Sequence, residues 1–93
     1  MGVLEAQHNI GNDYLRGEVF PKNEVKAFGW FMNASAHGFI YSKYNAAKIL
    51  ERGSECGKIK ANKKGALVLL EEIHRSGELN VESDIHALVH ELS

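Results

Sequence analysis

Few residues of this 93-residue chain have the types and spacing that chemistry requires. The single cysteine, Cys56, would be reactive only as a thiolate, which positive charge stabilises, and Lys58 and Lys60 follow it closely. His86 and His90 are four residues apart, so on a helix they face the same way and have the spacing of a two-histidine zinc or nickel chelate. No third ligand can be identified beside them. We therefore expect no catalytic residue and no resident metal or cofactor.

Simpler interpretations accompany both features. Cys56 is expected to be an exposed, incidental thiol, and the two histidines are expected to face solvent. A small metal-binding or enzymatic protein that uses Cys56 or the pair His86 and His90 stays open as the less favoured alternative. Residues 58–64 hold the one basic cluster, which is either a patch for phosphate or an acidic peptide, or a solvated loop that leads into a helix.

Composition excludes several classes of protein. Eleven Lys and Arg against twelve Asp and Glu give a net charge of −1, which argues against a nucleic-acid partner. A single cysteine cannot form an intrachain disulfide. The longest apolar run, residues 66–70, is far shorter than the roughly 20 residues that span a bilayer. The first residues also lack the pattern of a secretory signal, so we expect a cytoplasmic protein with no membrane partner.

The sequence predicts helices for the segments that carry the residues named above. Apolar residues recur with a period of 3.6, and no stretch alternates as a strand would. Asn23 and Asn62 are good N-caps, and four glycines stand where a helix would end in the left-handed conformation: Gly17, Gly38, Gly53 and Gly77. The expected helices cover about residues 4–16, 24–37, 42–52, 63–76 and 81–92. The fold class is therefore all-α.

The pattern also repeats along the chain. A shift of 36 residues places Asn9 on Asn45 and Gly17 on Gly53. After these glycines the shift becomes 39, which places Asn23 on Asn62. The difference is an insertion of three residues in the second loop, around residues 54–59. The chain thus holds two helix-turn-helix units and the first helix of a third.

One spacing pattern in the first unit is specific. It runs through Ala6, Asn9, Ile10, Gly11, Tyr14, Gly17, Phe20, Asn23, Lys26, Ala27, Trp30, Ala34 and Gly38. In these residues the chain resembles the Sel-one-like repeats, relatives of the tetratricopeptide repeats. The resemblance implies one domain over 1–93, with repeats over about 5–40 and 41–79 and a terminal capping half-repeat over about 80–93. Its fold would be an α/α superhelix of about five antiparallel helices, two and a half repeats long.

The repeat alignment also assigns packing roles. Gly11 and other small residues would let the helices approach closely, and Trp30 and Phe31 would fill the space between them. Phe20 and Ile59 would anchor their loops in the core.

The resemblance implies a non-catalytic adaptor or scaffold that binds another protein. In such folds the first helices of successive units line a concave face, where this chain presents His8, Asn12, Arg16, Tyr44, Lys48 and Arg52. This mostly basic stripe suits an extended acidic peptide or a chain terminus. The simpler interpretation is that the six residues only face solvent. The rival function is a self-assembling module in which exposed ends of the stack pair as a homodimer.

Overall fold

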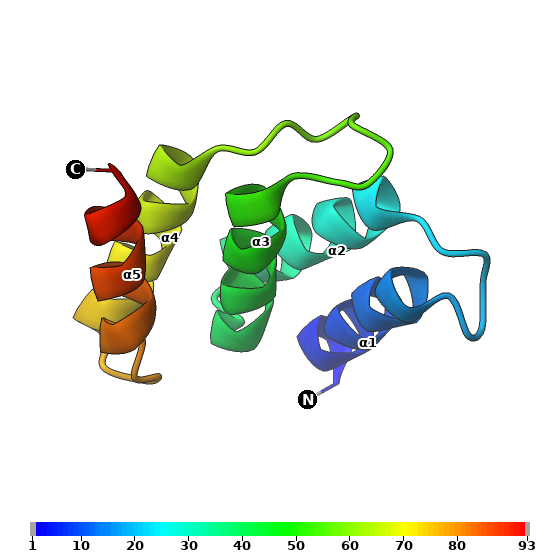
Figure 1. Ribbon diagram of the computed structural model, residues 1–93. Helices are drawn as coiled ribbons and strands as arrows, with labels where there is room; N and C mark the ends of the chain where they lie inside the picture. The colour runs from blue at the N-terminus through cyan, green and yellow to red at the C-terminus, as the bar shows by residue number, and fades with distance from the viewer. Residues whose placement is uncertain (1, 93) are drawn as a thin grey trace.

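The computed structural model describes residues 2–92, which form five α-helices and no strand (Figure 1). The helices are α1 (Val3–Arg16), α2 (Glu24–Ala36), α3 (Ile40–Arg52), α4 (Lys63–Ser76) and α5 (Glu82–Leu92). The all-α prediction is confirmed, and no helix end differs from its predicted place by more than two residues.

Each helix packs against the helix that precedes it and the helix that follows it. Figure 1 shows α1 at one end of the molecule, α3 in the middle and α5 at the other end. The backbone extends 38 × 33 × 17 Å along its principal axes, so the molecule is thin in one direction. Burial therefore has to come from contacts between neighbouring helices.

The two predicted asparagine caps are confirmed. The side chain of Asn23 accepts a hydrogen bond from the Lys26 N–H at 3.0 Å, and that of Asn62 accepts one from the Gly65 N–H at 2.9 Å. Each bond satisfies a backbone donor that the first turn of a helix leaves free. Both caps lie at positions that the 39-residue shift relates.

Further contacts recur at related positions. The Asn23 N–H donates to the Tyr14 carbonyl at 2.9 Å, and the Asn62 N–H donates to the Leu50 carbonyl at 2.7 Å, so both loops close onto the preceding helix in the same way. A side-chain pair recurs as well. Gln7 and Asn33 join α1 to α2 by a hydrogen bond of 3.0 Å, and the related Lys43 and Glu72 join α3 to α4 by an ion pair of 3.1 Å.

The glycines that follow the helices differ from one another. Gly17 and Gly77 adopt the left-handed conformation that the sequence predicts. The prediction is wrong at Gly53, where φ is 79° and ψ is 176°. The longer loop that follows explains the difference, because the chain must leave α3 extended for the Ser54 N–H to reach the Ile59 carbonyl at 2.8 Å.

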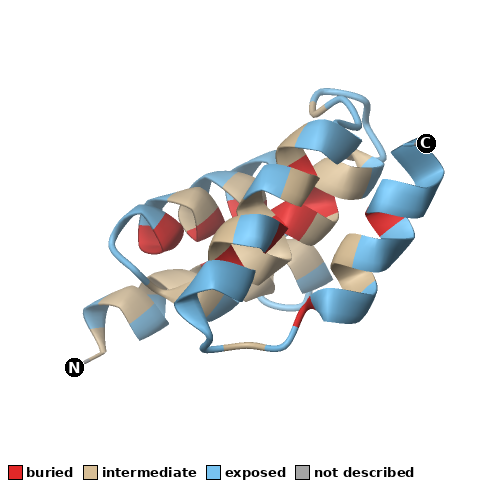
Figure 2. Ribbon diagram, turned by 90° about the vertical axis from the view of Figure 1, so that its left-hand side faces the viewer, coloured by how far each residue is buried: buried red, intermediate tan, exposed pale blue. Residues whose placement is uncertain are grey.

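The core consists of two clusters of buried side chains, and the buried residues are drawn in red in Figure 2. The first contains Ala27, Phe31, Ala46 and Ile49. The second contains Ala47, Ala66, Leu70, Ile73, Val81 and Leu88. Because α3 contributes to both clusters, and Leu69 packs against both, the two halves share their burial.

Most of the predicted packing roles hold. Phe31 is fully buried, and Ile59 packs against the first cluster as predicted. Phe20 stacks on the Tyr14 ring with centroids 4.6 Å apart, but it remains 38% exposed, so it covers its helix without entering the core. Trp30 is only half-buried and belongs to neither cluster.

Candidate functional site

The six residues of the predicted stripe lie on α1 and α3, and the structure gives them three different environments. His8 on α1 is half-buried between two rings, with centroids 5.5 Å from Phe31 and 5.1 Å from Phe39. Its Nδ1 shares a hydrogen bond of 2.7 Å with the hydroxyl of Ser42, which is fully buried at the start of α3. His8 therefore joins α1 to α3 and is not free for a ligand.

The environment of His8 also determines its charge. Burial lowers the pKa of the imidazole below its ordinary value because a positive charge is poorly solvated there, although the nearby carboxylate of Glu5 opposes the shift. At neutral pH the ring is therefore uncharged, and His8 adds nothing to a basic stripe.

Asn12 provides a second link between the same two helices. Its side-chain oxygen accepts a hydrogen bond from the Asn45 amide of α3 at 3.4 Å. Both residues are half-buried, so the middle of the stripe is a polar contact between α1 and α3, and only part of Asn12 is open to solvent.

Lys48 and Tyr44 face the last helix. The Lys48 ammonium lies 3.3 Å from Asp84 of α5 and 3.3 Å from Glu51, and the Tyr44 hydroxyl donates to Asp84 at 3.4 Å. The ammonium also lies 5.8 Å from the centre of the Tyr44 ring. Burial disfavours the charge on Lys48, but the hydrogen bonds and the charges of Asp84 and Glu51 outweigh it and raise the pKa of Lys48.

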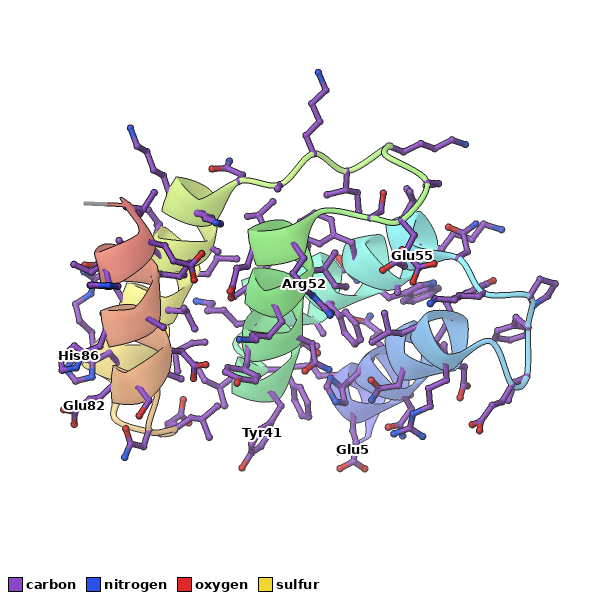
Figure 3. All side chains as sticks on the ribbon, viewed as in Figure 1. Glu5, Tyr41, Arg52, Glu55, Glu82 and His86 are labelled. Carbon is purple, nitrogen blue, oxygen red and sulfur yellow. The ribbon has the colours of Figure 1, made fainter. Side chains whose placement is uncertain are left out.

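The remaining two residues are open. Arg16 and Arg52 are exposed in the last turns of α1 and α3, at positions related by the 36-residue shift. Arg52 projects from α3 toward the side on which α1 and α2 lie (Figure 3). There it lines a hollow of about 380 Å³ together with Leu15, Glu24 and Glu55. Of the three cationic residues in the stripe, Arg16 and Arg52 are therefore the two that are exposed, and Arg52 shares its hollow with the carboxylates of Glu24 and Glu55.

An adjoining hollow of about 450 Å³ lies between the start of α2 and the loop that follows α3. Its walls include Lys22, Lys26 and Cys56. The loop is fastened here because the Glu55 N–H donates to Glu24 at 2.7 Å and the Glu55 carboxylate pairs with Lys22 at 3.0 Å.

The thiol of Cys56 is exposed, as the sequence predicts. A hydrogen bond with the Ser54 hydroxyl, together with one from the backbone of Lys58, lowers the pKa of the thiol. This favours a thiolate, and the other ionisable side chains that line the hollow are lysines and glutamates.

The histidine pair lies on the outer part of α5. Both His86 and His90 are exposed, and Figure 3 shows His86 beside Glu82 on the side of α5 away from α3. His86 borders a small hollow of about 190 Å³ that His74 and Glu71 also line. Within residues 2–92, no group of three or more potential metal ligands is close enough to hold an ion.

The basic cluster of residues 58–64 is divided by its contacts. Lys63 at the start of α4 forms an ion pair of 2.6 Å with Glu91 of α5, which raises the pKa of the lysine and lowers that of the carboxyl. Lys58, Lys60 and Lys64 are exposed along the loop and the first turn of α4.

Sequence reasoning missed the acidic partners of the stripe. The 39-residue shift relates Asp84 to Asn45 of α3. If α5 is taken as the first helix of a third unit, Asp84 therefore occupies the same helix position as Asn45.

No described helix is long and apolar enough to cross a membrane. Comparisons with protein-family models, with curated proteins and with solved structures found no match.

Proposed function

We propose that this chain is a Sel-one-like helical-repeat module that binds a partner protein and catalyses no reaction itself. The observation that carries the proposal is the recurrence of the same contacts in both helical pairs. The bonds that Asn23 and Asn62 make to their helices and loops occur at the offsets of the sequence repeat. Tandem units of this kind stack into extended surfaces, and they are used for recognition.

The last helix supports the same assignment. Val81, just before α5, and Ile85 and Leu88 within it correspond to Ser42, Ala46 and Ile49 of α3. Val81 and Leu88 are buried against the α3–α4 unit, just as Ala46 and Ile49 are buried against the α1–α2 unit. In this proposal α5 is a terminal half-repeat, and the five helices form an α/α superhelix.

The binding surface that the geometry favours is narrower than the stripe. His8 is neutral and Lys48 is paired with two carboxylates, so neither offers free positive charge. Arg16 and Arg52 remain, exposed at the ends of successive first helices. A guanidinium binds carboxylates through paired hydrogen bonds, and an extended acidic segment can reach both arginines.

A titration with a labelled octaglutamate peptide, followed by fluorescence anisotropy, tests this surface. The double variant Arg16→Glu and Arg52→Glu should bind about tenfold or more weakly, because each exposed ion pair contributes about 0.2–1 kcal/mol and reversal adds repulsion. The matched control is Arg75→Glu, an exposed arginine in the last turn of α4.

Binding by the control should equal that of the original chain. Equal binding by the double variant, or no saturable binding at low salt by any form, would show that the two arginines do not form the recognition surface. Circular dichroism of each form establishes that helicity is unchanged.

A further inference from the structure

The helices α1, α3 and α5 occupy the same position in successive repeats, but the corresponding face of each helix is buried to a different extent. This face consists of Ala6, Ile10 and Asp13 in α1, of Ser42, Ala46 and Ile49 in α3, and of Val81 just before α5 with Ile85 and Leu88 in α5. All three members in α3 are buried, as are Val81 and Leu88 of the last set. In α1, however, Ala6 is exposed and Ile10 is half-buried.

A position in α2 is likewise less buried than the corresponding position in α4. Trp30 of α2 corresponds to Leu69 of α4, and Leu69 packs against both core clusters. Trp30 is half-buried and lies outside both clusters. Val3, in the first turn of α1, is 71% exposed. Val3, Ala6, Ile10 and Trp30 make up what we call the end face.

We propose that the end face binds the end face of a second copy of this chain across a two-fold axis, giving a homodimer. The inference uses the repeat correspondence but does not depend on binding of an acidic partner. Tryptophan is enriched among the residues that dominate protein interfaces, and Trp30 is half-buried outside both core clusters.

Size complementarity favours a second copy. Ala6 and Ile10 are one helical turn apart on α1, so they lie on the same side of it. If two α1 helices pack antiparallel about an axis midway between these residues, Ile10 fits against the small Ala6 of the partner subunit, and the reciprocal contact follows by symmetry.

Charge complementarity favours the same arrangement. The same axis brings Asp13 opposite Val3 of the partner subunit, in the first turn of its α1. That helix begins at Val3, and Gly2 at its N-cap position has no side chain to cap it, so its first N–H groups lack the partner that a capping side chain would supply. A carboxylate accepts such donors and is stabilised by the positive end of the helix dipole.

The opposite end of the molecule is a poor partner for this face. The small hollow between α4 and α5 is lined by Glu71, His74, Glu82 and His86 along with Ile85. A head-to-tail arrangement would cover charged groups with apolar side chains, which is unfavourable. It would also generate an open chain of copies, whereas pairing of like ends closes as a dimer.

Sedimentation equilibrium between about 10 μM and 1 mM, a range that spans weak association, tests the proposal. The mass should rise from one chain to two, and the emission of Trp30, the only tryptophan, should shift to shorter wavelength over the same range. Ala6→Glu, at an exposed helical position, should shift dimerisation to at least tenfold higher concentration, and Asp13→Lys should weaken it as well. The control, Val68→Glu at a 53% exposed position on α4, should dimerise normally.

Circular dichroism shows whether each variant keeps its helices. A single-chain mass at every concentration would overturn the proposal and leave the end face to a different protein. A dimer that survives Ala6→Glu unchanged would overturn it too, because association would then use another surface.

Discussion

His8 shows how one side chain can serve the fold at a position expected to serve binding. Its ring fills the space between Phe31 and Phe39, and its Nδ1 shares a hydrogen bond with the buried Ser42 hydroxyl. A buried hydroxyl without a hydrogen bond is costly, so the helix contact depends on the imidazole. The neutral ring suits this place, which is why burial lowers its pKa.

Acidification should therefore weaken the fold through His8. Since the pKa is lower in the folded chain, the unfolded chain binds more protons, and stability falls as the pH falls. The contribution is complete above the ordinary histidine pKa of about 6.5, declines as the pH falls through that value, and is lost below the folded-state pKa. Urea unfolding at several pH values between 7.5 and 5 measures it.

The control for this titration is His8→Gln, which keeps a hydrogen-bonding group but does not titrate. The variant should lose less stability on acidification than the original chain, since the other four histidines are common to both. Identical pH dependence in the two forms would contradict the assignment.

The ion-pair partners of individual side chains could not be predicted from the sequence. Lys48 lies on a polar helix face and reads as free positive charge, yet Asp84, 36 residues later, pairs with it. The pairing depends on how α5 packs against the preceding unit, and helical periodicity fixes only the orientation of Lys48 on its own helix. The repeat offers a partial clue, because it places Asp84 on the same helix position as Asn45.

At the scale of elements, the approach of α1 to α2 depends on Gly11. A Cβ atom there would lie 2.6 Å from the Phe31 ring, and that ring is fully buried and cannot move aside freely. The related position in α3 is Ala47, also buried, so a small residue recurs where paired helices come closest.

Gly11→Ala should accordingly destabilise the chain by about 1–3 kcal/mol through overpacking, despite the better helix propensity of alanine. Gly29→Ala is the matched control, because a Cβ at Gly29 in α2 meets no atom within 4 Å. That control should stabilise by about 0.5–1 kcal/mol. Urea unfolding of the two variants measures both values, and a stabilising Gly11→Ala would refute the close approach.

Helices were predictable here because their signals are local. Asn23 and Asn62 cap the turns that follow them directly, and periodicity depends on neighbours three and four residues away. The loops depend on distant contacts. The loop that follows α3 takes its path from bonds such as that between the Glu55 N–H and Glu24, 31 residues earlier, and such a bond has no local signal.

For the whole molecule, the division of the core raises the question of whether its halves unfold together. The first cluster lies among α1, α2 and α3, and the second among α3, α4 and α5. Repeat proteins remain cooperative when the contact between neighbouring units is strong relative to the stability of each unit. Here α3 belongs to both clusters, with Ala46 and Ile49 in one and Ala47 in the other.

Leu88→Ala should therefore destabilise both halves alike. Leu88 is 1% exposed in the second cluster, and loss of such a side chain costs about 2–5 kcal/mol. Trp30 lies in the first unit, yet its fluorescence midpoint in urea should fall by the same amount as the midpoint of far-UV circular dichroism, because one cooperative transition links them. Low protein concentration keeps association from contributing to either signal. If the dichroism midpoint fell while that of Trp30 stayed in place, α5 would unfold separately, and the shared helix α3 would not couple the two clusters.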